Sequence, residues 1–194
     1  MHLLRFASIL AFSTVQAFAQ EDRQLGTHEH GVGQLDIAFE GSQIAISFAA
    51  PGADIVGFEY LPKTTADTRA IEMALSTIRE PRNLFIFPQG ARCRATETSA
   101  RLKGGSPDAH AGHNHAGRVD KKRGPQPSRS THTEFRATYS LECADMGAIK
   151  QMEFEYFKVF PNALELDVRI LSAQGASTFQ VQRDNPVLDL SDQI

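Results

Sequence analysis

Cysteine is scarce in this chain of 194 residues, which contains only Cys93 and Cys143. The two do not form a CxxC motif, and no lone cysteine stands with the signature of a catalytic thiol, so the sequence does not indicate thiol redox or thiol protease chemistry. HExxH is absent, as is any methionine-rich tract of the kind that binds Cu(I). After residue 19 no apolar run is long enough to span a bilayer, which argues against a membrane-embedded protein.

The first 19 residues, MHLLRFASILAFSTVQAFA, have the layout of a secretory signal peptide. Arg5 precedes the apolar run 6–15, and Ala17-Phe18-Ala19 is an A-x-A cleavage site, so we expect a cut after Ala19. Export places the chain in an oxidising space, which favours a disulfide between Cys93 and Cys143; two separate buried thiols are the alternative. Residues 20–194 are then expected to form a single domain with its own core.

The fold class predicted by hydrophobic patterning is α+β, mostly antiparallel β-sheet with one clear helix. Residues 34–40 and 43–49 both alternate around Gly41-Ser42, which predicts a hairpin. Residues 65–80 have helical spacing and stop before Pro81. Further strands are expected over 84–87, 132–143, 149–156, 163–171, 179–181 and 187–190.

Residues 103–130, KGGSPDAHAGHNHAGRVDKKRGPQPSRS, have no apolar periodicity. Their Gly, Pro, Ser and charge predict a disordered insertion in the folded body, because little apolar surface is available to offset the entropy of ordering. Segment 101–129 carries seven basic and two acidic residues, whereas the rest of the chain is acidic. The acidic body, together with export, argues against nucleic-acid binding.

Three histidines of this insertion, His110, His113 and His115, lie within six positions, and Asp108 could add an oxygen ligand. Histidine-rich tracts bind metals such as zinc without needing a fixed fold, and no packing role is available to these rings. The alternative is a solvated linker. Imidazole suits copper and nickel as well as zinc, so the spacing alone leaves the metal open.

Two smaller clusters flank the strands. His28-Glu29-His30 directly precedes the first predicted strand, and its two rings share one side if the chain there is extended. His132-x-Glu134 opens the strand after the insertion, where His132 could give one rigid ligand. A frayed polar lead-in and an ordinary surface strand are equally compatible with these patterns.

Taken in order, the motifs resemble those of the ZrgA-like family of periplasmic, His-rich zinc-uptake accessory proteins. The matching stretches are THEHGVGQL at 27–35, APGADIVGFE at 50–59, Cys93, the His-rich insertion, HTEFRATYSLEC at 132–143 and FPN at 160–162. The resemblance implies a periplasmic protein that binds zinc and supports import through a zinc ABC transporter.

The resemblance also implies a set of zinc ligands. The candidates are His28, His30, His110, His113, His115 and His132. Glu29, Glu59 and Glu134 are candidate ligands or hydrogen-bond acceptors for a ligand, and Glu59 could instead be a buried structural carboxylate. Two departures stand out: the insertion has only three histidines, and Tyr60 follows GFE where relatives often have histidine.

The function expected from the sequence is therefore zinc capture and delivery to a zinc solute-binding protein or ABC transporter, without enzymatic activity. A small zinc-dependent hydrolase using His28 and His30 is one alternative, although no general base or nucleophile stands at a recognised spacing. A periplasmic interaction module using the basic run 121–123 is another. The oligomeric state is left open.

Overall fold

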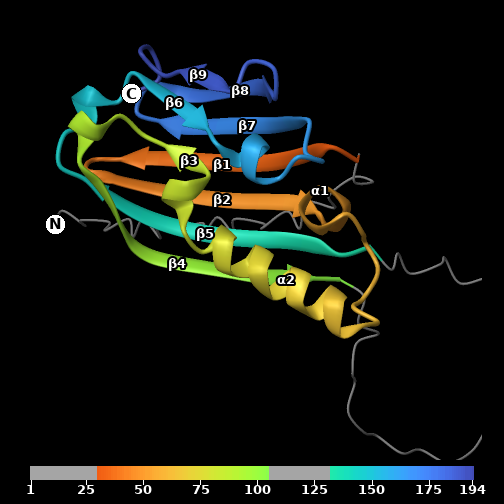
Figure 1. Cartoon of the computed structure of the whole chain (residues 1–194). Coiled ribbons are helices and arrows are strands. Elements are labelled where there is room, and N and C mark those ends of the chain that lie inside the picture. Colours follow the sequence, from red (N-terminus) through yellow and green to blue (C-terminus); the bar gives the residue numbers. More distant parts are fainter. Residues whose placement is uncertain (1–29, 105–131) are drawn as a thin grey trace, which may run out of the picture.

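The computed structural model describes residues 30–104 and 132–194. The predicted signal peptide, most of the insertion, and the candidate residues His28, Glu29, Asp108, His110, His113 and His115 lie outside these ranges. Two sheets make up most of the described fold, a six-stranded sheet in the order β4-β5-β2-β1-β7-β8 and a three-stranded sheet in the order β3-β6-β9 (Figure 1). The strands are β1 Val32–Glu40, β2 Gln43–Pro51, β3 Phe85–Ile86, β4 Cys93–Lys103, β5 Glu134–Cys143, β6 Gln151–Phe154, β7 Glu165–Ser172, β8 Gly175–Gln182 and β9 Val187–Asp189.

The α+β prediction is confirmed, and so is the first hairpin. β1 and β2 pair antiparallel with Leu35 opposite Phe48 and Ile37 opposite Ile46, and all four side chains are buried. Alternation sets this register, because a slip by one residue would move every apolar side chain to the other face. The six-stranded sheet is nevertheless mixed, since β1 also pairs with β7 in parallel.

The one long helix, α2 (Thr65–Ile78), agrees with the predicted helix 65–80. Thr64 accepts a hydrogen bond from the Asp67 amide while the Asp67 carboxylate accepts from the Thr64 amide, a capping box that satisfies two otherwise unpaired donors. Ile71, Ala74 and Ile78 are buried, and the helix lies over the β4–β5 side of the large sheet (Figure 1). The Tyr139 hydroxyl donates to the Ile78 carbonyl at 2.7 Å and so ties β5 to the end of the helix.

An aromatic cluster joins the two sheets. Phe85 of β3 makes edge contacts with Phe48, Tyr139 and Phe154, and Phe48 in turn meets Tyr156. These rings are all buried, and burial of each contributes roughly 1.5–3 kcal/mol. The core therefore lies between the six-stranded sheet and the layer formed by α2 and the small sheet.

Two segments differ from the sequence expectation. The strand predicted over 149–156 ends at Phe154, and residues Tyr156–Val159 form the short helix α3. Burial of Tyr156, Phe157 and Phe160 follows a helical spacing rather than an alternating one. Strand β4 has no counterpart among the predicted strands because most of its side chains are exposed at the sheet edge, which removes the apolar alternation.

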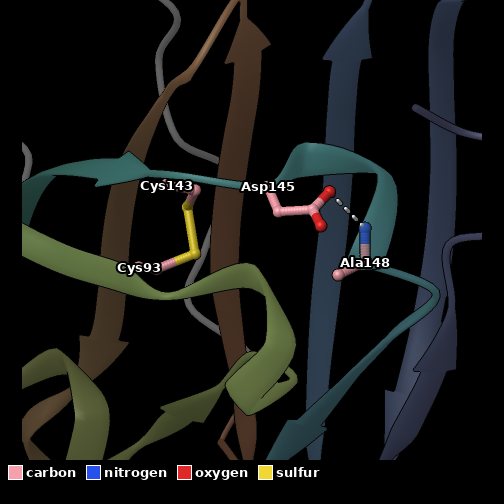
Figure 2. The surroundings of a disulfide bond; sticks show 4 residues. All are labelled: Cys93, Cys143, Asp145 and Ala148. Atoms are coloured by element: carbon pink, nitrogen blue, oxygen red, sulfur yellow. Dashed lines mark hydrogen bonds between the residues drawn. A yellow bond between two sulfur atoms is a disulfide. The ribbon is translucent and has the colours of Figure 1, made fainter.

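The Cys93–Cys143 disulfide is present and joins residues that are directly opposite in the β4–β5 pair (Figure 2). Beyond Cys143, Asp145 accepts a hydrogen bond from the Ala148 amide at 3.2 Å and caps a 3₁₀ turn (Figure 2). The Asp145 amide donates to the Ala91 carbonyl at 3.1 Å. The disulfide thus anchors the end of the β4–β5 hairpin that lies away from the insertion.

No helix in residues 30–104 and 132–194 has both the length and the apolar character needed to cross a membrane.

We expect the double variant Cys93→Ala/Cys143→Ala to lose stability, because the bond closes a loop of 50 residues in the unfolded chain. The chain-entropy model puts the loss at about 4 kcal/mol. Urea unfolding with and without a reducing agent measures it. Reductant should weaken the wild type and leave the double variant unchanged; an equal response of the two proteins would contradict the assignment.

Candidate metal centre

Three segments that are distant in the sequence meet at the end of the large sheet where α1 (Gly52–Val56) follows β2 (Figure 1). His30 lies two residues before β1, His132 lies two residues before β5, and Glu59 follows the turn that ends α1. The register explains the meeting, because Glu134 is paired with Pro51 on one side and Lys103 on the other. Sheet pairing thus brings both histidines to the same corner.

Glu59 is the centre of this corner. Its side chain is only 11% exposed, and its Oε2 atom is hydrogen-bonded to Nδ1 of His132. Its Oε1 atom is 3.6 Å from Nδ1 of His30, which is beyond hydrogen-bond range, and it has no hydrogen-bond partner among the described residues. A buried carboxylate oxygen without a partner is costly, and a cation or a donated proton would offset that cost.

The two imidazole rings are much more exposed than Glu59, at 67% for His30 and 53% for His132. An ionised carboxylate only accepts hydrogen bonds, so Nδ1 of His132 is the donor in its bond with Glu59. In the neutral ring this leaves the lone pair on Nε2. The Nδ1 atom of His30 faces the same carboxylate. For His132 this is the arrangement in which a carboxylate orients a histidine and leaves its other nitrogen available to a metal.

Backbone hydrogen bonds hold Thr133, the residue directly after His132. The Thr133 amide donates to the Glu59 carbonyl at 2.8 Å, and the Gly52 amide donates to the Thr133 carbonyl at 2.8 Å. Gly52 is tightly enclosed, because a Cβ there would lie 2.5 Å from the Phe58 carbonyl oxygen and closer still to Thr133 Oγ1. Residues 52–59 therefore pack directly against the start of β5.

The same segment fixes His30 through a different residue. Asp54 of α1 is 2% exposed, and its Oδ1 accepts a hydrogen bond from the Gly31 amide at 2.8 Å. The Gly31 carbonyl accepts from the amides of Leu164 and Glu165 at 2.8 and 2.9 Å. Gly31 has φ of +88°, a conformation that glycine adopts readily.

A buried hydroxyl lies beneath this corner. Tyr156 is fully buried, and burial, together with the nearby Asp54 carboxylate, raises the pKa of its phenol well above the ordinary value. The phenol is therefore neutral at any physiological pH. The carboxyl groups of Asp54 and Glu59 are both largely buried at this corner, while the two imidazoles are exposed.

The side chains at this corner supply some of the donor atoms that a zinc site needs. Imidazole nitrogen and carboxylate oxygen are both zinc ligands, and a complete tetrahedral site needs four donors. Within residues 30–104 and 132–194, no three or more His, Cys, Asp or Glu side chains are grouped closely enough to hold a metal ion by themselves. His30, His132 and Glu59 therefore do not form a complete metal site by themselves.

The other sequence candidates in the described ranges have different surroundings. Glu134 is buried, and its carboxylate accepts a hydrogen bond from Arg136. Tyr60 stacks on Phe58 with ring centroids 4.6 Å apart, and the Lys63 ammonium lies 4.7 Å from the Tyr60 centroid. Sequence reasoning overlooked Asp54; an acid flanked by apolar residues in GADIVGF was the available signal.

The insertion is attached beside the same corner. Gly104 has φ of +113°, and a Cβ on it would clash with the His132 carbonyl oxygen. The chain therefore leaves the described fold at Gly104 and returns at His132 in neighbouring positions. The histidine at the return point is one of the two that face Glu59.

A comparison with protein-family models finds a match over residues 27–190 to the family described as "ZrgA family zinc uptake protein". No curated protein sequence matches the chain. The matched range includes His30, Asp54, Glu59 and His132.

We expect Gly52→Ala to destabilise the protein by roughly 1–3 kcal/mol, because the added methyl group overlaps two buried groups. Gly90→Ala is the matched control, since its Cβ would meet only the Ala148 methyl at an ordinary 3.4 Å. Thermal unfolding of both variants measures the difference. Equal melting temperatures would contradict the close packing of residues 52–59 on β5.

Proposed function

Because the chain belongs to the ZrgA family of zinc uptake proteins, we propose that it is a periplasmic accessory protein that captures zinc through its histidines and supports import by an ABC transporter. A role in zinc uptake follows from the family itself, which is not a known enzyme class. The capture mechanism, the compartment and the receiving partner are the proposal. The disulfide between Cys93 and Cys143 is consistent with export.

The observation that carries the proposal is the position of Glu59 between two exposed imidazoles. The carboxylate fixes the Nδ1 side of His132 and faces that of His30, so each ring can present Nε2 to zinc. A negative charge behind the rings strengthens them as ligands, and orienting partners of this kind typically change metal affinity 10–100-fold. Glu59 thus acts in the proposal mainly as the orienting carboxylate.

The remaining donors are proposed to come from the histidines that flank this corner in the sequence. His28 is two residues before His30, and His110, His113 and His115 belong to the insertion attached at Gly104 and His132. Ordering each residue of such a segment costs roughly 1–2 kcal/mol, which lowers the affinity of a site that depends on it. A site of intermediate affinity suits a protein that hands its zinc to a tighter-binding solute-binding protein or transporter.

We expect zinc titration of residues 20–194 to separate the two groups of histidines. His30→Ala/His132→Ala should lose the zinc bound at the corner, and Glu59→Gln should keep the stoichiometry but bind about 10–100-fold more weakly. His110→Ala/His113→Ala/His115→Ala should lose a further equivalent or weaken the first. Calorimetry with native mass spectrometry gives affinity and stoichiometry together.

The control for these variants is Arg94→Ala/Glu142→Ala, which removes an exposed ion pair near the disulfide and leaves the net charge unchanged. It should bind zinc as the wild type does. If all histidine variants also bind zinc like the wild type, the capture mechanism is wrong.

A further inference from the structure

Asp54 is a buried acid that the proposed zinc coordination does not use. It lies in the first turn of α1, yet its Oδ1 accepts a hydrogen bond from Gly31, 23 residues earlier in the chain. The Gly31 amide belongs to the peptide bond that follows His30. The carboxylate therefore holds the peptide plane next to the histidine rather than the histidine ring itself.

Hydrogen bonds hold both the amide and the carbonyl of Gly31. Its amide is held by Asp54 at 2.8 Å, and its carbonyl is held by the amides of Leu164 and Glu165. A buried hydrogen bond to a carboxylate is stronger than one between neutral groups. The Asp54 bond fixes the peptide plane directly after His30, the residue whose ring faces Glu59.

Residues 52–59 are hydrogen-bonded to the residues that follow both histidines. Asp54 holds the peptide after His30, while the Glu59 carbonyl accepts from the Thr133 amide, next to His132. The Glu59 carboxylate then faces both rings. The bonds made by residues 52–59 thus determine how far apart the two imidazoles lie.

We propose that Asp54 is a positioning residue of the zinc site, which holds the His30–Gly31 peptide so that His30 is placed opposite Glu59. This inference rests on the proposed function. Asp54 contacts no zinc. Its loss should free His30, so that zinc must order the residue on binding, and the affinity of the corner should fall about tenfold with unchanged stoichiometry.

The first test needs no substitution at the site. Coupling between sites is reciprocal, so if the Gly31 bond positions a zinc ligand, bound zinc must also stabilise that bond. Hydrogen exchange of the Gly31 amide in the wild-type chain should slow at least several-fold when zinc is added. Gly41, another glycine with positive φ, lies in the β1–β2 turn and should not respond. An unchanged exchange rate at Gly31 overturns the inference.

The second test uses variants in the His110→Ala/His113→Ala/His115→Ala background, in which the histidines of the insertion cannot bind zinc and any remaining binding depends on His30, His132 and the neighbouring His28. Asp54→Ala should weaken binding about tenfold, and Asp54→Asn, whose side-chain carbonyl can still accept from Gly31, should recover part of the loss. Tyr139→Phe is the matched control, because it also removes a buried hydrogen bond but one made to Ile78. It should lower stability without changing zinc affinity.

The outcomes distinguish the two proposals. If His30→Ala/His132→Ala loses zinc while a folded Asp54→Ala binds it normally, the positioning role is wrong and the proposed function stands. If His30→Ala/His132→Ala binds zinc normally, the positioning role is wrong, and the proposed function fails as well when His110→Ala/His113→Ala/His115→Ala also binds it normally. If Asp54→Ala does not fold, the exchange of Gly31 in the wild-type chain decides the question alone.

Discussion

The hydrogen bonds that tie residues 52–59 to the starts of β1 and β5 are the constraint on which this corner of the protein depends. The two ends of the segment hold Thr133, through the Gly52 amide and the Glu59 carbonyl, and its middle holds Gly31 through the Asp54 carboxylate. Asp54 is 2% exposed, and a buried carboxylate is costly without hydrogen-bond donors, so losing the Gly31 amide from Oδ1 would be unfavourable. Because the strands β1, β2 and β5 are adjacent in the sheet, the three tied segments form one rigid unit.

That rigidity explains why Glu59 stays buried between two exposed rings. Backbone contacts determine where Glu59 lies, because its backbone carbonyl accepts a hydrogen bond from the Thr133 amide. A flexible glutamate would turn toward water and leave the rings unpaired. Held in place, it has one oxygen hydrogen-bonded to His132 and another without a hydrogen-bond partner among the described residues. In the proposed function, a metal bound at this corner would not have to order the residues that the fold already holds.

Sequence patterns predicted the parts of the fold that alternate or repeat helically, and failed where burial does not follow such a period. The β1–β2 hairpin and α2 were predictable because one face of each is buried. Strand β4 was not, because it is an exposed edge, and the parallel pairing of β1 with β7 could not be read from two segments 130 residues apart. In the site, the residue types of His30, Glu59 and His132 were recognisable from family motifs. Their contact was not, because it depends on sheet register, and Asp54 was overlooked because its partner is a backbone amide.

The β4–β5 hairpin connects the disulfide-bonded end of the fold to the end where His30, Glu59 and His132 meet. Cys93 and Cys143 are paired at one end of this ladder, while Lys103 and Glu134 are paired at the other, next to Gly104 and His132. The disulfide keeps the two strands together, so the residues on both sides of the insertion stay side by side even though β4 has only one strand neighbour. In the proposed function this arrangement has a direct consequence. The insertion can supply extra histidines to the corner without unpairing the sheet, and zinc can exchange between the fixed pair and these extra ligands while the fold around Glu59 is unchanged.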